Sequence, residues 1–349
     1  MKHFFISDRK VGDSAPPFII AEMSANHGGD FDRALRIIKS AADSEADAIK
    51  FQAYKPESIT LDSSKEEFRI KSGELWQGKT LYELYEEACT PYDWFGELFK
   101  FARSCGVIPF CSVFDQEGVE LMKELDAPAY KIASFEAVDH GLIKQCALTQ
   151  KPLIISTGLC EEAEIHEAIS VVRSCGNEEV ALLKCTSAYP AVIGDANLIT
   201  IPKMRNIFGT LVGVSDHTLG TAVSVAACAL GADIVEKHVI DDKTKPTADS
   251  AFSIEPDELS ELVLDCKAAS SARGVVQMHP TRNEAKNLIY RRSLYSVKRI
   301  RKGETISSEN VKSIRPGFGL GPKHLNEIVG KVATKDIDAA TPISWELIS

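Results

Sequence analysis

Short apolar runs recur along much of the chain, and longer segments with helical spacing lie between them. The eight runs cover residues 18–24, 48–54, 107–113, 129–134, 153–158, 181–187, 211–217 and 233–239. Between them, segments such as DRALRIIKSAADSEA and TAVSVAACALGA repeat apolar residues every three or four positions, as amphipathic helices do. Short strands that alternate with helices predict parallel strands joined by helical crossovers.

Eight strand–helix units fit about 250 residues, which is the usual size of a closed (β/α)8 barrel, or TIM barrel. An open, doubly wound sheet is the structural competitor. The G-x-G-x-x-G fingerprint of such a sheet does not follow the first apolar run. We therefore predict an α/β protein with a TIM barrel over residues 1–270.

The pattern changes after residue 270. Residues 271–290 are interpreted as a linker. Residues 291–349 hold short strand-like segments separated by many turn residues, and the first part of this region is basic. The pattern predicts a separate small β-rich domain over residues 291–349.

The segment between the second and third apolar runs is longer than one helix requires. Long insertions after barrel strands lie at the C-terminal face of the barrel and often shape the substrate pocket. The insertion is rich in aromatic residues: Trp76, Tyr82, Tyr85, Tyr92 and Trp94. For any one of these rings, anchoring an additional helix is the more ordinary role, and contact with a ligand is the alternative.

The composition narrows the classes of function. The net charge of −10 and the pI near 5.4 argue against nonspecific binding to nucleic acid or to an anionic membrane. No secretory signal pattern opens the chain, and no apolar run is long enough to span a membrane. The nine cysteines include no C-x-x-C pair, which favours reduced thiols in a cytoplasmic protein.

Lysines interrupt four of the apolar runs, at Lys50, Lys131, Lys184 and Lys237. A lysine in a buried strand is unfavourable unless it meets an opposite charge, so any single one could be a structural ion pair. Several that converge on the mouth of a barrel, together with serines, instead favour a cradle for phosphate or carboxylate. Lys237 points away from the face shared by Glu236 and His238, which favours a structural role for it.

Two strand-like segments, VGVSDHTLG and IVEKHVI, each deliver a histidine near the end of the strand. His217 and His238 would lie on neighbouring strands at the same level. Two neutral imidazoles suit a divalent ion such as Mn²⁺ whose other ligands are water and substrate oxygens. A hydrogen-bonded core pair and a general base are the alternatives. No cysteine lies directly beside them and no H-E-x-x-H motif is present, which disfavours structural or protease-type zinc.

Motifs at the strand ends resemble those of the sialic acid synthase family, whose members condense phosphoenolpyruvate with an N-acetylated sugar. The matching motifs occur in the family's order and are AEMSANHGG, AIKFQAY, YKIASFE, ISTG, KCTSAYP, VGVSDHTLG and EKHVI. IRPGFGLGP resembles the antifreeze-like (SAF) domain that closes these synthases. Within the family, SANH, LWQGKTLYELYEEACTPYDW and SAFSIEP look most like the branch that makes pseudaminic acid.

The resemblance implies phosphoenolpyruvate and 2,4-diacetamido-2,4,6-trideoxy-L-altrose as substrates, with a sialic acid or legionaminic acid synthase as the alternative. It implies that His217 and His238 bind a divalent metal, with Mn²⁺ favoured over Mg²⁺ or Co²⁺. The positions that match the phosphoenolpyruvate site are Lys50, Ser112, Lys131, Ser134, Ser156, Ser187, Ser215 and Arg315. The positions that match the acceptor-sugar site are Gln52, Tyr189 and Asp249. The catalytic candidates are Glu22, Glu136 and Lys131.

Arg315 matches an arginine that the small domain of one subunit inserts into the barrel of the other, which implies a domain-swapped homodimer. One loop departs from the family pattern. It reads DDKTKPTADS, with no arginine and with Thr247 and Ala248 before Asp249, where relatives usually carry an arginine and Gly-Pro-Asp or Gly-Gly-Asp.

Two other classes of protein remain open. A Schiff-base aldolase would need one lysine with a lowered pKa, and Lys131 or Lys184 is the candidate. A carbohydrate-binding protein without catalysis is the second class. A complete polar lining argues against it, because a binding module has no need for both metal ligands and a phosphate cradle.

Overall fold

The computed structural model describes residues 3–71 and 75–349. The chain forms two compact units, Met1–Gly274 and Val275–Ser349. The first unit ends just after helix α10 (Pro256–Arg273), so the predicted barrel limit at residue 270 lies in the last turn of that helix. Among the described residues, no helix is long and apolar enough to cross a bilayer.

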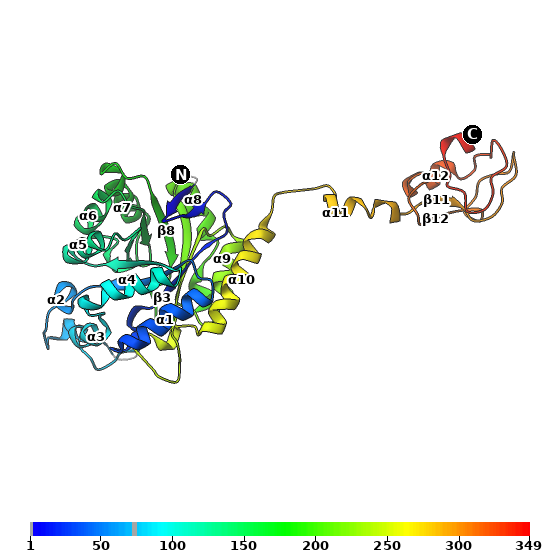
Figure 1. Cartoon of the computed structure of the whole chain (residues 1–349). Helices are drawn as coiled ribbons and strands as arrows, with labels where there is room; N and C mark the ends of the chain where they lie inside the picture. The colour runs from blue at the N-terminus through cyan, green and yellow to red at the C-terminus, as the bar shows by residue number, and fades with distance from the viewer. Residues whose placement is uncertain (1–2, 72–74) are drawn as a thin grey trace. The chain divides into compact units, whose positions relative to one another are not determined.

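The first unit is a closed parallel barrel of eight strands in the order β10-β3-β4-β5-β6-β7-β8-β9 (Figure 1). All eight predicted runs form these strands, and the TIM-barrel prediction is confirmed. The strands are β3 (Phe18–Glu22), β4 (Ala48–Ala53), β5 (Ile108–Val113), β6 (Tyr130–Ile132), β7 (Leu153–Ser156), β8 (Val180–Cys185), β9 (Leu211–Asp216) and β10 (Ile234–His238).

Helices cover the outside of the barrel, and their apolar faces are buried against the strands (Figure 1). They are α1 (Phe31–Asp43), α4 (Phe95–Ser104), α5 (Gln116–Glu124), α6 (His140–Leu148), α7 (Glu162–Ser174), α8 (Thr200–Phe208), α9 (Ala222–Ala229) and α10. Asp30, Asp115 and Asp139 cap α1, α5 and α6, each accepting a hydrogen bond from a backbone N–H of the first turn. The strand-to-helix loops therefore start each of these helices at a fixed residue.

Alternate residues of each strand face opposite sides, and this places the polar site at one end of the barrel. Ile19 faces the helices, whereas Phe18 and Ile20 belong to the cluster inside the barrel. A hairpin of β1 (His3–Ile6) and β2 (Arg9–Gly12), which the sequence did not predict, adds Phe4, Ile6 and Val11 to this inner cluster. The hairpin closes the N-terminal end with apolar side chains, so the polar residues gather at the other end.

The insertion between β4 and β5 forms α2 (Pro56–Ile59), the 3-10 turns η2 (Glu66–Phe68) and η3 (Tyr92–Trp94), and α3 (Leu81–Ala88). A capping box between Thr80 and Glu83 starts α3. The Tyr85 ring packs on Tyr54, with ring centroids 5.9 Å apart, and the Trp94 ring packs on Phe31 at 5.2 Å. These two rings therefore anchor the insertion.

The second unit begins with an extended segment, α11 (Arg282–Ala285) and the turn η7 (Leu288–Tyr290). An antiparallel pair follows, formed by β11 (Ser293–Ser296) and β12 (Val311–Ile314), with isolated bridges such as Ile300–Ile337 completing the β structure. The remaining elements are η8 (Pro322–His324), α12 (Leu325–Ile328) and η9 (Trp345–Leu347). Buried Leu294, Ile306 and Ile343 contribute to a separate small core.

Candidate active site

Lys50 is the first of two buried lysines at the polar end of the barrel. Glu22 of β3 is in register with Lys50 of β4, and the Lys50 Nζ lies 2.7 Å from the Glu22 Oε2. The same Nζ donates a hydrogen bond to the Ser112 Oγ, at 2.8 Å, and lies 3.6 Å from the Glu236 Oε1. Burial lowers the pKa of Lys50, but the carboxylates of Glu22 and Glu236 outweigh it and raise the pKa above its ordinary value.

Lys131 of β6 is the second buried lysine. Its Nζ donates to the Ser156 Oγ at 2.7 Å and lies 3.7 Å from the Glu236 Oε1. Burial lowers the pKa of this lysine, and the nearby carboxylate of Glu236 opposes that effect only in part. Of the two lysines, Lys131 therefore loses its proton more easily than Lys50, although it still faces the buried carboxylate of Glu236.

Glu236 of β10 joins the two lysines, and the sequence analysis assigned it no role. Its Oε1 also accepts a hydrogen bond from the Ser215 Oγ at 3.2 Å. Burial raises the pKa of Glu236, but Lys131 and Lys50 outweigh burial and hold the pKa below its ordinary value. The sequence signal was available: Glu236 shares a strand face with His238 and interrupts an apolar run.

Two ammonium groups and two carboxylates thus lie together at the polar end of the barrel. Burial raises the pKa of Glu22, and the neighbouring Glu236 adds to this, while Lys50 opposes it. Charges removed from water are tolerated only when each has a partner. An arriving phosphate or carboxylate can replace a protein carboxylate as the partner of Lys50 or Lys131.

Gly158, which has no side chain, lies beside this cluster. Its N–H donates to the Ser134 Oγ at 3.2 Å. A Cβ added to Gly158 would lie 2.2 Å from the Ser187 Oγ and 2.9 Å from the Ser134 Oγ, which is closer than any real contact. A side chain at position 158 would therefore displace Ser134 or Ser187, whose hydroxyls lie close together near Ser156.

The two candidate metal ligands lie on neighbouring strands, with the ring centroids of His217 and His238 5.3 Å apart. The Nδ1 of His217 lies 3.1 Å from the carbonyl oxygen of Thr186 and therefore carries the proton, which leaves Nε2 as the free ligand atom. The Nδ1 of His238 is buried and has no hydrogen-bond partner. Burial holds the pKa of His238 well below its ordinary value, and a proton on His217 would act in the same direction, so the His238 ring is neutral.

The donor set fits a divalent ion held by two imidazoles. A ligand nitrogen has to be unprotonated, and an unpartnered buried Nδ1 meets this requirement. The Asp249 Oδ2 lies 3.6 Å from the same Nδ1, so this carboxylate lies beside the candidate ligand atom. Among residues 3–71 and 75–349, no group of three His, Cys, Asp or Glu side chains is gathered to hold a metal, so water or substrate oxygen would complete the coordination.

The aromatic side of the pocket is formed by Tyr189. Its ring packs on His217, with centroids 4.5 Å apart, and on Phe252 at 5.3 Å. The Trp76 ring lies 5.9 Å from the Tyr189 ring, and the Trp76 indole N–H donates to the carbonyl oxygen of Ala248 at 2.9 Å. Trp76 therefore contacts the site itself, unlike Tyr85 and Trp94.

Three further candidates differ in how closely they join the cluster. The Gln52 Nε2 donates to the Glu22 Oε1 at 3.1 Å, so Gln52 extends the charged network. Asp249 is buried and accepts a hydrogen bond from the Ala25 N–H at 3.4 Å. Glu136, in the turn η4 (Ser134–Glu136), has a buried Oε2 with no partner, and burial raises its pKa to about 7.

Comparison with known proteins identifies the family. Residues 37–278 match the model of the NeuB family, and residues 291–349 match that of the SAF domain. The chain belongs to the NeuB family. The predicted family membership and the predicted SAF domain are both confirmed.

Relatives within the NeuB family differ in similarity to this chain. The pseudaminic acid synthase of Campylobacter jejuni strain 81-176 is 46% identical over 96% of this chain and 95% of its own length. The corresponding enzyme of Helicobacter pylori is 43% identical over 94% of this chain and 97% of its own length. The N,N'-diacetyllegionaminic acid synthase of Legionella pneumophila is 33% identical over 98% of this chain and 99% of its own. The crystal structure of the Leptospira borgpetersenii N-acetylneuraminic acid synthetase in complex with citrate is 31% identical, with a TM-score of 0.74 over 82% of this chain and 95% of that chain.

Two further candidate residues lie outside the cluster. Arg315 belongs to the C-terminal unit, and its entry into a partner's barrel stays a prediction. Lys184 of β8 points to the carbonyl oxygen of Cys185, at 3.0 Å, and lines a small cavity with His217. Burial lowers the pKa of Lys184.

Lys237 is a structural residue, as its position in the strand predicted. Its Nζ lies 3.0 Å from the Asp216 Oδ2 and also donates to the carbonyl oxygen of Thr218. Asp216 in turn accepts a hydrogen bond from the Ser224 Oγ of α9, at 2.7 Å. The buried Lys237–Asp216 pair therefore joins β9 and β10 to the helix layer, on the face opposite to Glu236 and His238.

Proposed function

We propose that this NeuB-family transferase condenses phosphoenolpyruvate with 2,4-diacetamido-2,4,6-trideoxy-L-altrose to give pseudaminic acid and phosphate. The observation that carries the proposal is the arrangement at the barrel mouth. Two serine-bound lysines lie beside a buried glutamate, next to a pair of histidines of which one has an unpartnered nitrogen. The higher identity to two pseudaminic acid synthases favours this product over legionaminic or sialic acid.

Lys50 and Lys131 would bind the phosphate and carboxylate of phosphoenolpyruvate. Each already donates to a serine hydroxyl, Ser112 or Ser156, which keeps the ammonium group oriented. Anions bound by buried ammonium groups gain strong charge-assisted hydrogen bonds. The hydroxyls of Ser134, Ser187 and Ser215 complete the cradle on the same side of the barrel.

His217 and His238 would hold a divalent ion, with Mn²⁺ favoured and Mg²⁺ or Co²⁺ as alternatives. When bound, such an ion supplies Lewis-acid polarisation of a carbonyl oxygen, here that of the open-chain sugar. The chain itself contributes orientation. The Thr186 carbonyl fixes the tautomer of His217, and Asp249 lies beside the ring of His238.

Carbon–carbon bond formation would start with carbon 3 of phosphoenolpyruvate attacking the sugar aldehyde carbon. Positive charge then develops at carbon 2, and water adds there. Holding both substrates at contact distance supplies much of the entropic advantage. The C–O bond to phosphate breaks last, and Lys50 and Lys131 offset the charge of the departing phosphate.

Glu136 would take the proton from the attacking water. Its unpartnered Oε2 is free to accept a proton, and its pKa of about 7 suits a general base at neutral pH. Glu22 is the second candidate, but its carboxylate is already engaged by Lys50 and Gln52. The structure of the cluster therefore favours Glu136 as base and Glu22 as the group that holds Lys50.

The acceptor sugar would lie between the histidines and the aromatic side of the pocket. Gln52, Tyr189 and Asp249 are the proposed contacts, as the family resemblance implies. Tyr189 offers a ring that is held by His217 and Phe252, and apolar ring faces pack well on sugar C–H groups. Trp76 joins this set, because its ring lies against that of Tyr189.

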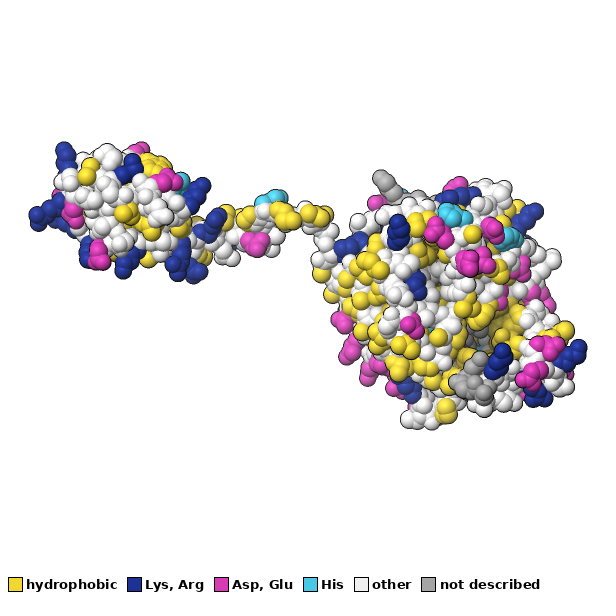
Figure 2. All heavy atoms as spheres, turned by 180° about the vertical axis from the view of Figure 1, so that it is seen from behind, with side chains coloured by type: hydrophobic (Ala, Val, Ile, Leu, Met, Phe, Trp, Pro, Cys, Tyr) yellow, Lys and Arg dark blue, Asp and Glu magenta, His cyan; other side chains and the backbone are white. Residues whose placement is uncertain are grey.

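A homodimer is part of the proposal, with Arg315 of each C-terminal unit entering the partner's barrel. The loops that follow β6, β7, β8 and β9 expose a rim of large apolar side chains. They are Phe135, Val138, Leu159, Val192, Ile193, Ile199 and Leu219. Such a rim is typical of a protein–protein contact. Figure 2 shows apolar side chains, in yellow, along the segment that joins the two units. In that segment Val275, Val276 and Met278 are more than four-fifths exposed.

We also expect the protein to act in a reducing cytoplasm. All nine cysteines are free thiols, and five of them are buried in the folded units. Buried free thiols behave as small apolar side chains and persist where disulfide formation is suppressed.

The test supplies the purified protein with Mn²⁺, phosphoenolpyruvate and one of two sugars, the diacetamido-trideoxy-altrose or N-acetylmannosamine. Phosphate release and the mass of the nine-carbon acid are followed. Turnover with the altrose sugar alone is expected. Turnover with N-acetylmannosamine instead would move the protein to the sialic acid branch, and no turnover with either would overturn the proposed substrate.

A Schiff-base aldolase is the second candidate, because the lowered pKa of Lys131 is what such chemistry requires. Incubation with pyruvate and borohydride, followed by mass spectrometry of peptides containing Lys131 or Lys184, tests it. We expect no adduct, because Lys131 already has Glu236 and Ser156 as partners. A trapped lysine would replace the synthase proposal.

A further inference from the structure

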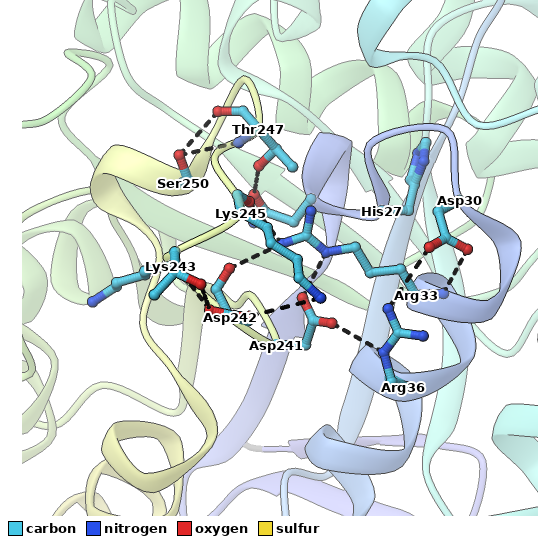
Figure 3. Close-up of polar contacts among 12 residues, drawn as sticks. His27, Asp30, Arg33, Arg36, Asp241, Asp242, Lys243, Lys245, Thr247 and Ser250 are labelled. Carbon is cyan, nitrogen blue, oxygen red and sulfur yellow. Dashed lines mark hydrogen bonds and ion pairs between the residues drawn. The ribbon is translucent and has the colours of Figure 1, made fainter.

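The loop of residues 241–250, which follows β10, is held by a side chain from the opposite end of the sequence. Figure 3 shows Arg33 of α1 reaching into this loop. Its Nε donates to the Asp241 Oδ1 at 2.6 Å. Its Nη2 donates to the carbonyl oxygens of Asp242, at 3.1 Å, and Lys245, at 2.9 Å. The Arg33 guanidinium therefore contacts the loop at three residues, Asp241, Asp242 and Lys245.

Polar contacts rather than apolar burial hold this loop. Residues 243–246 are exposed, and the loop contains no arginine of its own. The Arg33 side chain is only 7% exposed and that of Asp241 10%, so this ion pair is shielded from solvent. Arg36 also contacts the carboxylate of Asp241, at 3.2 Å, but its side chain is half exposed. Charge-assisted hydrogen bonds that are shielded from solvent contribute more than exposed ion pairs.

The far half of the loop leads directly into the acceptor side of the pocket. The Thr247 Oγ1 donates to the Asn26 Oδ1 at 2.6 Å. The next residue, Ala248, accepts the Trp76 indole hydrogen bond, and Asp249 follows beside His238. A shift of the turn at residues 242–245 would therefore move the two residues that meet Trp76 and His238.

We propose that Arg33, paired with Asp241, is a positioning residue for the acceptor-sugar side of the site. Its guanidinium fixes the turn so that Asp249 and Ala248 keep their places beside His238 and Trp76. The inference rests on the proposed function only in naming the ligand as the sugar. The contacts of Arg33 do not involve the lysine cluster, so phosphoenolpyruvate binding should be independent of it.

The experiment compares Arg33→Lys and Arg33→Met with Arg36→Met in the full-length protein. Arg36→Met is the matched control, because it removes a second arginine from the same carboxylate and the same helix. The KM for the altrose sugar is expected to rise about tenfold or more in Arg33→Met, since buried charge-assisted hydrogen bonds are lost. The KM for phosphoenolpyruvate should stay within about twofold in every variant, because interactions confined to one substrate change that KM alone.

A readout without turnover accompanies the kinetics. Amide hydrogen exchange of the peptide covering residues 242–250 should accelerate about tenfold or more in Arg33→Met and less in Arg33→Lys, and stay unchanged in Arg36→Met, as expected for loss of a local tie. Thermal unfolding identifies a variant that loses the whole fold. Asp241→Asn should change exchange and the sugar KM in the same direction but less than Arg33→Met, because the hydrogen bonds of Arg33 to the carbonyl oxygens of Asp242 and Lys245 remain. Adding Asp241→Asn to Arg33→Met should add little, because the interaction that the two residues share is already lost.

Unchanged exchange and an unchanged sugar KM in Arg33→Met would overturn the inference, as would an equal rise in the KM for both substrates. A wild-type protein that turns over neither sugar would remove the proposed function alone. In that case accelerated exchange in the Arg33 variants would still support the positioning role, and unchanged exchange would reject it.

Discussion

Replacing Glu136 by glutamine should stabilise the protein at high pH and sharply lower its turnover. Burial raises the pKa of Glu136 from 4.5 to about 7, against the smaller opposing effects of a backbone hydrogen bond and Lys131. One pKa unit corresponds to about 1.4 kcal/mol, so keeping this carboxylate charged in the folded state costs up to about 3 kcal/mol. Glu136 is partly exposed, and solvent screening reduces the expected figure to about 1–3 kcal/mol.

The sign of the pH dependence follows from which state binds the proton more tightly. Below pH 4.5 Glu136 is protonated in both states and carries no penalty. As the pH rises from 4.5 to about 7, the unfolded chain releases the proton first, so the folded state loses stability over this window and the penalty is complete above it. Glutamine carries no charge at any pH, so the variant should gain on the wild type only as the pH rises.

The assay is urea unfolding at pH 5 and pH 8, followed by tryptophan fluorescence. The chain has three tryptophans, and a Trp345→Phe background leaves Trp76 and Trp94, both in the barrel unit. We expect a small difference between the Glu136→Gln variant and its parent at pH 5, and a stabilisation of about 1–3 kcal/mol at pH 8. Turnover should fall by about 10²–10⁴-fold, which is the usual contribution of a general base. A difference in stability that is the same at both pH values would refute the reasoning, and normal turnover would remove Glu136 as the base.

Three further outcomes test the rest of the site. His238→Ala should lose bound Mn²⁺ by elemental analysis and about 10³-fold in kcat, since Lewis-acid polarisation contributes several kcal/mol; normal turnover would end the metal assignment. Lys237→Met should lower the free energy of unfolding by about 3–5 kcal/mol, because it leaves Asp216 as a buried unpaired charge, yet leave both KM values unchanged; equal stability would mean that this pair is not structural. Trp76→Phe keeps an aromatic ring, although a smaller one, and loses the hydrogen bond to Ala248, so the sugar KM should rise about fivefold while the phosphoenolpyruvate KM stays constant; an unchanged sugar KM in steady-state kinetics would show that the indole N–H is unimportant.

The barrel was predictable because its strands are buried on both faces. Parallel strands of this kind are nearly continuous apolar runs, and polar residues such as Lys50 and Lys131 stand out within them. The N-terminal hairpin was missed, because its two strands have only four residues each and are joined by a two-residue turn at Ser7 and Asp8. Only the closed barrel shows that the apolar residues of the hairpin fill its N-terminal end.

The candidate site was predictable where strand ends alone determine position. Lys50, Ser112, Lys131 and Ser156 lie on consecutive strands, so fold class places them together. The strand face shared with His238 pointed to Glu236 as well, but its position between Lys50 and Lys131 became clear only from the distances in the structure.

Contacts made by the loops could not be predicted from the sequence, for a different reason. Trp76 and Ala248 are 172 positions apart, and Arg33 and Asp241 are 208 positions apart. Neither pair follows a periodic pattern, and arginine on an amphipathic helix normally faces solvent. Only the folded loop shows that Arg33 has turned inward to meet it.

The close packing around Gly158 restricts which substitutions the site can accept. Because a Cβ there would lie 2.2 Å from one serine hydroxyl and 2.9 Å from another, no other residue fits without moving Ser134 or Ser187. A mutational library over these three positions would therefore be strongly coupled. A larger residue at position 158 would be accepted only together with a smaller residue at position 187. A larger residue at position 187 would find no additional space, because position 158 already lacks a side chain. A redesign of the site for a different product acid should keep Ser134, Gly158 and Ser187 unchanged. It should vary the aromatic side of the site instead, where Trp76 and Tyr189 meet.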